Sequence, residues 1–165
     1  MDTYNGFSRE IYRADAARAA YLYLFGGLYV DLDFVCLKNH EDLFSSEADV
    51  YLGEMEPGHP HGILNAWMAS KKGCDFWIHF LHQIDDEAKK GKASKMIVEN
   101  LTGSVALFRA IKTYNGKAKI KLIEGSKVYP INHICGDPRE LMDKGVEEMR
   151  KRWPDAFAVT FWTGS

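Results

Sequence analysis

Two aspartates separated by a single residue, Asp31 and Asp33, are the side chains of this sequence best suited to chemistry. They follow the apolar residues 28–30, and two carboxylates at the end of an apolar strand are costly unless a cation balances their charge. Mg²⁺ and Mn²⁺ take one or two protein carboxylates and complete their shell with water and phosphate oxygens. The pattern therefore predicts a divalent-cation site. The alternative is a surface-turned strand end that carries two solvated acids.

The segment expected to carry these acids is a strand over residues 28–34, buried in the centre of a sheet. Alternation along such a strand places Asp31 and Asp33 on the same side of it. Residues 9–25 are mostly good helix formers, and the following Gly26-Gly27 supplies a helix cap and the turn that aims the strand. Open α/β sheets bind ligands at the carboxyl ends of their strands, which is where both acids fall.

The rest of the sequence alternates between strand-like and helix-like segments. Further strands are expected at 49–55, 119–123, 127–131 and 157–162, and further helices at 63–70, 75–90, 104–114 and 138–153. A stretch rich in proline and glycine at 56–62 excludes regular structure and is a candidate wall of the site. The alternation predicts the α/β class, with one domain over residues 1–165.

The composition is that of a folded globular chain, with 46% hydrophobic and 13% aromatic residues. The formal net charge of -2 provides no general basic field, so no nucleic-acid partner is expected. The longest apolar stretches fall short of the ~20 residues that a membrane-spanning helix needs. The three cysteines, Cys36, Cys74 and Cys135, are far apart, which favours neither a zinc ribbon nor a disulfide framework.

A longer pattern surrounds the two acids. It runs through Tyr12-Arg13-Ala14-Asp15-Ala16-Ala17-Arg18, Leu22-Tyr23 and Phe25-Gly26-Gly27-Leu28-Tyr29-Val30-Asp31-Leu32-Asp33. This pattern resembles the signature of the family 32 glycosyltransferases and their relatives, the large clostridial glucosylating toxins, with Ala19 in place of the usual tyrosine. Weaker matches extend the resemblance downstream, at Asn65-Ala66, Thr102-Gly103, Tyr129-Pro130 and Trp162-Thr163-Gly164-Ser165.

The resemblance implies a truncated GT-A-like fold, a small mixed sheet flanked by helices that binds a sugar nucleotide. It implies that Asp15 and Arg18 reach hydroxyls of the donor sugar, for which an acceptor and a donor side chain are both suited. It makes Asp31 and Asp33 the catalytic residues: Asp33 binds Mn²⁺ or Mg²⁺ directly, and Asp31 contacts ribose or sugar and the metal shell through water. The alternative for Asp15 and Arg18 is a simple ion pair on a helix surface.

Four further residues take roles from the same resemblance. Trp162 is assigned to the substrate and Ser165 to the metal. Tyr29, on the acid side of the expected strand, suits packing as well as substrate binding. Asn65 resembles an amide that faces the sugar or the acceptor, and it equally suits an asparagine at a helix terminus that bonds nearby backbone.

The chain departs from the family pattern in two places. Many members carry a histidine that completes the metal shell where this chain has Thr160, which predicts a weaker or water-completed metal site. Relatives also carry a βα unit ahead of the helix that holds Asp15, and only fourteen residues precede Asp15 here. Three interpretations stay open: a trimmed piece, a homodimer or second chain that completes the site, and a natural minimal form.

The function implied is that of a retaining glycosyltransferase, which moves a hexose from a UDP- or GDP-linked sugar to a glycan, lipid or protein acceptor. The compartment implied is the cytoplasm for a bacterial or viral source and the Golgi lumen for a eukaryotic one. One alternative is a weakly active or inactive module that binds sugar nucleotides. Another is a haloacid-dehalogenase-like phosphatase, because residues 31–35 fit its nucleophile motif and Gly136-Asp137 with Asp143 imitates its second metal motif.

Overall fold

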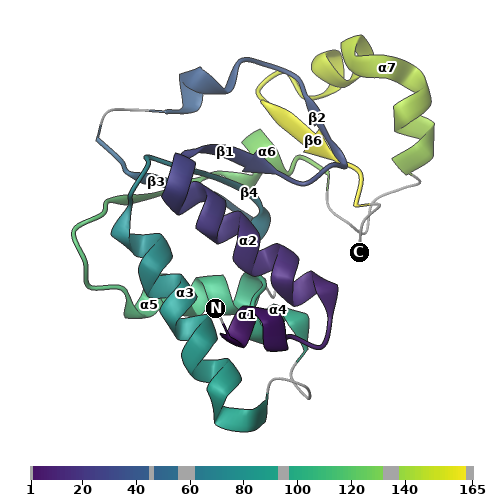
Figure 1. Cartoon of the computed structure of the whole chain (residues 1–165). Coiled ribbons are helices and arrows are strands. Elements are labelled where there is room, and N and C mark those ends of the chain that lie inside the picture. The colour runs from purple at the N-terminus through teal and green to yellow at the C-terminus, as the bar shows by residue number, and fades with distance from the viewer. Residues whose placement is uncertain (1, 45–46, 56–61, 93–96, 132–137, 163–165) are drawn as a thin grey trace.

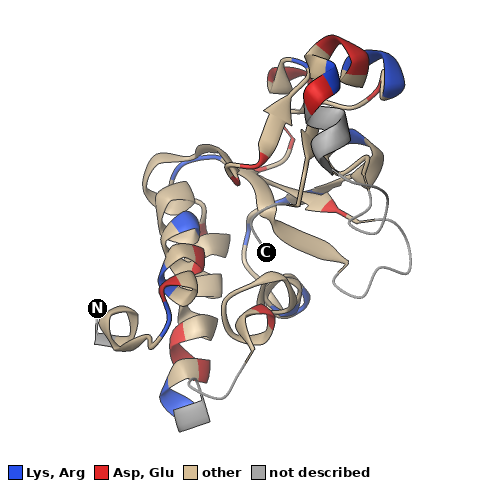
Figure 2. Ribbon diagram, turned by 90° about the vertical axis from the view of Figure 1, so that its right-hand side faces the viewer, with Lys and Arg blue, Asp and Glu red and all other residues tan. Residues whose placement is uncertain are grey.

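Helices pack against a small mixed sheet whose strands lie between residues 27 and 123, and a second, two-stranded sheet lies beside helix α7 (Pro138–Arg152) (Figure 1). The structure, a computed structural model, describes residues 2–44, 47–55, 62–92, 97–131 and 138–162. None of the helices within these ranges is long and apolar enough to span a membrane. Acidic and basic residues are interspersed along the ribbon in the view of Figure 2, so neither sign of charge gathers there into one field.

Helix α2 (Glu10–Phe25) confirms the helix predicted at 9–25 and carries two of the predicted site residues on its buried face. The helix ends where the N–H of Gly26 donates to the Leu22 carbonyl at 3.0 Å. Gly26 has a φ of 69°, and a Cβ at this position would lie 2.6 Å from the Lys72 nitrogen, so glycine is required. The buried residues of α2 are Tyr12, Asp15, Ala16, Arg18, Ala19 and Leu22.

The segment that carries the two acids is not the single buried central strand predicted at 28–34. Strand β1 (Gly27–Val30) ends one residue before Asp31, a turn follows, and β2 (Phe34–Cys36) belongs to the other sheet. The N–H of Phe34 donates to the Asp31 carbonyl at 3.3 Å and closes the turn. The prediction failed because aspartate favours turns, and apolar alternation alone cannot separate one strand from two short strands joined by a turn.

The main sheet is mixed and has the strand order β1-β4-β3-β5. Strand β4 (Ile63–Ser70) runs antiparallel to both β1 and β3 (Val50–Glu54), whereas β3 runs parallel to β5 (Ile120–Ile123). The strands predicted at 49–55 and 119–123 are confirmed, but the helix predicted at 63–70 is wrong. This short apolar run fits a helix or a buried strand equally well, and pairing with two neighbours decides for the strand. The predicted α/β class is confirmed, and this mixed sheet with its flanking helices is consistent with a GT-A-like fold.

Helices α2, α3 (Asp75–Glu87) and α5 (Ser104–Thr113) enclose the larger apolar core together with the main sheet (Figure 1). Phe76, Trp77 and Leu107 are fully buried in this core, so the helices predicted at 75–90 and 104–114 are confirmed. The helical segments of this part are α1 (Asp2–Gly6), α3 (Asp75–Glu87), the single π-helical turn η2 (Ala88–Lys92), α4 (Val98–Leu101) and α5 (Ser104–Thr113).

The C-terminal part returns the chain to the turn at residues 31–33, which carries Asp31 and Asp33 and is called the acid turn below. Strand β6 (Ala158–Thr160) pairs antiparallel with β2, which confirms the last predicted strand in a shorter form. The strand predicted at 127–131 is wrong, because the helical turn α6 (Gly125–Val128) occupies its first half and the Tyr129 N–H donates to the Gly125 carbonyl. Helix α7 (Pro138–Arg152) is confirmed, with a break at Gly145. A 3-10 turn, η1 (His40–Leu43), follows β2.

Candidate functional site

A cavity of about 970 Å³ lies where α2, the acid turn, β4 and the start of α5 meet. Its polar wall combines residues that are far apart in the sequence, and its remaining wall is largely apolar. The charged residues among the described lining residues are Asp15, Asp31, Asp33, Glu99, Arg9 and Arg18. Carboxylates therefore outnumber arginines four to two around this cavity.

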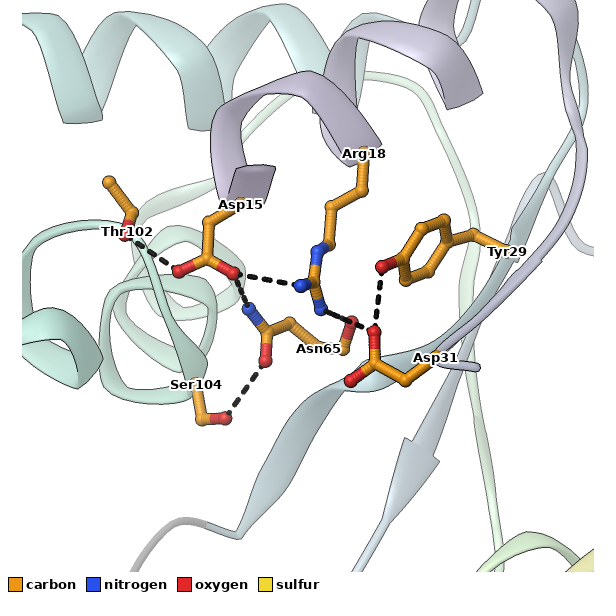
Figure 3. Close-up of polar contacts among 7 residues, drawn as sticks. All are labelled: Asp15, Arg18, Tyr29, Asp31, Asn65, Thr102 and Ser104. Atoms are coloured by element: carbon orange, nitrogen blue, oxygen red, sulfur yellow. Dashed lines mark hydrogen bonds and ion pairs between the residues drawn. The ribbon is translucent and has the colours of Figure 1, made fainter. Parts of the chain in front are cut away.

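Asp15 lines this cavity and is 3% exposed. Its Oδ1 accepts from Asn65 Nδ2 at 2.9 Å and lies 3.2 Å from Arg18 Nη2, and its Oδ2 accepts from the Thr102 hydroxyl at 2.7 Å (Figure 3). Burial raises the pKa of Asp15, whereas the Arg18 charge and the bonds from Thr102 and Asn65 oppose that shift. One carboxylate of α2 is thus tied to β4 and to the segment between α4 and α5.

Arg18 joins Asp15 to the acid turn. Its Nη1 lies 3.2 Å from Asp31 Oδ1 and donates to the Asn65 carbonyl at 2.7 Å, and its guanidinium carbon lies 4.7 Å from the centre of the Tyr29 ring (Figure 3). The arginine is 7% exposed, and in the described part of the chain its Nε has no hydrogen-bond partner. The ion pair considered as the alternative role of Asp15 and Arg18 is present, but it is buried and shared with Asp31 rather than placed on a helix surface.

Tyr29 packs and bonds at the same time. Its ring contacts Arg18, and its hydroxyl donates to Asp31 Oδ1 at 2.6 Å. Burial and this hydrogen bond raise the pKa of Tyr29, so the phenol stays protonated and stays a donor. Both contacts of Asp31 with side chains use Oδ1, and Oδ2 takes part in neither.

Asp33 lies on the turn and lines the cavity beside Asp31. Its carbonyl accepts from the Phe161 N–H at 3.1 Å, so the chain that follows β6 holds the turn in place. In the described ranges there is no group of three or more His, Cys, Asp or Glu side chains arranged to hold a metal ion. Two carboxylates nevertheless match the donor set of Mg²⁺ or Mn²⁺ that shares its shell with water and substrate phosphates. Ser165, the other predicted metal ligand, lies outside the described residues.

Comparison with known proteins agrees with this geometry. Residues 1–49 match the family model described as a glycosyltransferase sugar-binding region containing a DXD motif. A curated relative, inositol phosphoceramide mannosyltransferase 1 of Schizosaccharomyces pombe (strain 972 / ATCC 24843), is 33% identical over 84 residues. The two matches support the glycosyltransferase family for this chain. The match covers 51% of the chain and 25% of the relative, so the chain spans about a quarter of that protein.

The region matched by the DXD family model contains Asp15, Arg18, Asp31 and Asp33, the four residues on which the predicted resemblance depends. Glycosyltransferases that carry the DXD motif generally use a divalent metal ion, and the family match does not specify which ion. A glycosyltransferase role is therefore supported, and the structure places the four predicted residues around one cavity.

Asn65 and Trp162 also line this cavity, as their predicted substrate roles require. Asn65 stands on β4 and bonds Asp15 with its side chain, so its alternative role at a helix terminus is wrong. The indole N–H of Trp162 donates to the Ile131 carbonyl at 2.9 Å, and its ring stacks on Tyr129. Thr160, at the position of the family's usual histidine, is buried and accepts from the Trp162 N–H at 3.3 Å.

The structure adds two residues to the site, Thr102 and Ser104, for which the sequence predicts no role there. The Thr102 hydroxyl bonds Asp15, and the Ser104 hydroxyl donates to Asn65 Oδ1 at 3.4 Å (Figure 3). The signal in the sequence is the weak match of Thr102-Gly103 to the family pattern. That match does not predict a contact with Asp15, because the two residues are 87 positions apart. The predicted site wall at 56–62 falls outside the described residues except for Gly62.

Proposed function

We propose that this chain forms the donor-binding part of a retaining, metal-dependent glycosyltransferase that transfers a hexose from a nucleoside-diphosphate sugar. The observation that carries the proposal is the cavity wall, where the DXD acids and the pair of Asp15 and Arg18 face one space. Among the described lining residues four carboxylates stand against two arginines. A diphosphate would add further negative charge to this wall, so a cation is needed between the wall and the phosphates.

Asp33, with Asp31 beside it, would hold that cation. Both acids line the cavity, and the family resemblance assigns the direct contact with the metal to Asp33. When bound, the cation supplies stabilisation of the negative charge that develops on the leaving diphosphate. The family resemblance assigns Asp31 a contact with ribose or sugar, and its position between Arg18 and the cavity suits that role.

Asp15 and Arg18 are the proposed contacts for the transferred sugar. An ionised carboxylate offers about four acceptor sites. Three donors already reach Asp15, from Arg18, Asn65 and Thr102, so room remains for one sugar hydroxyl. Groups held this firmly bind and orient the sugar without further ordering, and transfer then depends on positioning and on electrostatics.

The relative's name describes mannose transfer and inositol phosphoceramide. We therefore place GDP-mannose first among candidate donors, followed by UDP-glucose, UDP-galactose and UDP-N-acetylglucosamine. A lipid is the first acceptor class to test, ahead of glycans and proteins.

The deciding experiment is a calorimetric titration of these four sugar nucleotides with Mn²⁺ and with EDTA, together with an assay for hydrolysis in the absence of acceptor. The expected result is one donor that binds in the presence of Mn²⁺ and is slowly hydrolysed. Binding of no sugar nucleotide under either condition would refute the proposal. Binding without hydrolysis or transfer would assign the chain to a sugar-nucleotide-binding module instead.

The same protein tested with p-nitrophenyl phosphate addresses the phosphatase alternative. Asp143, which was to imitate part of a second metal motif, stands on α7 and does not line the cavity, and Gly136 and Asp137 lie outside the described residues. We expect no phosphatase activity above the rate of the Asp33→Asn variant.

A further inference from the structure

Thr102 is a fully buried polar residue at the junction between α4 and α5. Its backbone N–H donates to the Val98 carbonyl at 3.0 Å, and so does the N–H of Gly103. A Cβ at Gly103 would lie 2.9 Å from the Glu99 Cα, so the backbone on both sides of the threonine is closely packed. The Thr102 hydroxyl therefore stands at a position that the main chain fixes.

That hydroxyl points at the carboxylate of Asp15. The Thr102 Oγ1 donates to Asp15 Oδ2 at 2.7 Å, and Asn65 Nδ2 donates to Oδ1 at 2.9 Å (Figure 3). One donor comes from the α4–α5 junction and the other from β4, so neither belongs to the helix that carries the acid. Two donors from separate elements fix the plane of the carboxylate as well as its position.

The carboxylate of Asp15 is one of the groups that contact the Arg18 guanidinium. Asp15 Oδ1 faces Arg18 Nη2 at 3.2 Å, and Nη1 of the same planar group faces Asp31 at 3.2 Å. Because the guanidinium is rigid, rotation of the Asp15 carboxylate would move both contacts together. This chain of contacts connects Thr102 to the cavity wall, although Thr102 is not among the described lining residues itself.

We propose that Thr102 is a positioning residue for the donor sugar: its hydroxyl fixes the Asp15 carboxylate in the orientation that places Arg18 between Asp15 and Asp31. The inference rests on the proposed function, since Asp15 and Arg18 are the assigned sugar contacts. Loss of the hydroxyl leaves a buried acceptor of Asp15 without its donor, so the carboxylate turns and the arginine follows. The effect should fall on the sugar and spare the nucleotide.

The test compares Thr102→Val, which keeps the shape and removes the hydroxyl, with Thr102→Ser, which keeps the hydroxyl and removes the methyl group. The quantity measured is the sugar-dependent gain, the ratio of the Kd of the nucleoside diphosphate to that of its sugar nucleotide, both with Mn²⁺. The probes are the tightest of the four donors above and its parent diphosphate. Circular dichroism and denaturant unfolding establish that each variant is folded at the titration temperature.

Thr102→Val should reduce the sugar-dependent gain roughly tenfold, and Thr102→Ser should retain it to within about twofold. The affinity for the bare diphosphate should stay the same in both variants. In an Asp15→Ala background, Thr102→Val should have no further effect on the gain, because the residue through which it acts is gone. A threonine that only stabilised the fold would not change the two affinities to different degrees: its loss would weaken both ligands alike.

An undiminished gain in Thr102→Val, an equal loss in Thr102→Ser, or equal weakening of both ligands would each overturn the positioning role. A protein without substitutions that binds diphosphate and sugar nucleotide equally well would overturn the sugar role of Asp15 and Arg18, and the positioning role with it. Failure of the sugar role is seen with the unmodified protein, before any variant is made. It is therefore distinguishable from failure of the positioning role alone.

Discussion

Asp15 and Asp33 are acids of the same cavity wall, but the fold holds them in different ways. The carboxylate of Asp15 is 3% exposed, faces a buried arginine and accepts two further hydrogen bonds. Asp33 is partly exposed and stands on the turn beside Asp31, whose side chain is 34% exposed. Arg18 supplies a counter-charge to Asp15 and also reaches Asp31 on the turn, so the two sides of the cavity share one buried arginine. They differ in exposure, and the proposed function adds a bound cation on the more exposed side.

Removal of the two acids should have unequal effects on folding, and this is the largest difference expected. Asp15→Ala leaves Arg18 buried with one carboxylate fewer, which should lower the free energy of unfolding by about 3–5 kcal/mol. Asp33→Ala acts on a partly exposed turn and should change it by no more than about 0.5 kcal/mol. Urea denaturation without metal measures both. Equal losses in the two variants would show that the two sides of the wall are held alike.

Removal of the turn acid should instead have its effect on metal-dependent binding. Asp33→Asn should weaken the sugar nucleotide in Mn²⁺ by about 3 kcal/mol, more than a hundredfold in Kd, because a charged metal ligand is lost. The residual affinity should no longer respond to EDTA. Asp86→Asn, which changes an exposed acid of α3, is the matched control and should bind as the unmodified protein does. Unchanged, metal-dependent affinity in Asp33→Asn would exclude Asp33 as the ligand.

The Asp15 side should discriminate the sugar rather than the nucleotide. Asp15→Asn keeps the shape of the side chain and removes its charge. Arg18 then loses an ionic partner at the place where the sugar is proposed to bind. We expect the sugar nucleotide to bind more weakly by about 1–3 kcal/mol and the bare nucleoside diphosphate to bind as before. Paired calorimetric titrations compare the two ligands. Equal weakening of both would place Asp15 at the nucleotide or in the fold alone.

Tyr29→Phe probes the boundary between the two sides with a smaller change. The variant keeps the ring beside Arg18 and removes the donor to Asp31, so the free energy of unfolding should fall by about 0.5–1.5 kcal/mol. Tyr21→Phe is the matched control on an exposed face of α2 and should leave stability unchanged. If both variants unfold alike, the hydroxyl of Tyr29 does not contribute to the wall.

The smallest effect expected is a dependence of stability on pH that comes from Asp15. Burial raises the pKa of Asp15 above its ordinary value of 3.8, against the Arg18 charge and the bonds from Thr102 and Asn65, and with a further increase from Asp31. The native chain therefore takes up this proton at a higher pH than the unfolded chain does. The contribution of Asp15 to stability is largest below pH 3.8 and falls as pH rises through the raised folded pKa.

Unfolding of the unmodified protein and of Asp15→Asn between pH 4 and 7 isolates this contribution from those of other acids. The difference in unfolding free energy between the two proteins should fall as pH rises through that interval. A difference that is constant across the interval, or that rises with pH, would contradict a raised pKa for Asp15.

Spacing along the chain was sufficient for the features that depend on neighbouring residues. A separation of three positions places Asp15 and Arg18 on one face of a helix, and Gly26, with a φ of 69°, ends that helix. The amphipathic spacing of α3 and α5 was equally local, and both helices form where the sequence predicts them. The Asp-x-Asp pattern likewise identified two acids that share a cavity.

The tertiary structure decided the features that depend on partners distant in the sequence. Residues 63–70 form a strand because β1 and β3 pair with them on both sides, and no local pattern contains that information. The chain turns after Asp31 because β2 pairs with β6 in a second sheet. Thr102 reaches Asp15 across 87 residues only once the α4–α5 junction has packed beside α2. Local spacing fixes which side chains share a face, and chain packing fixes which faces meet.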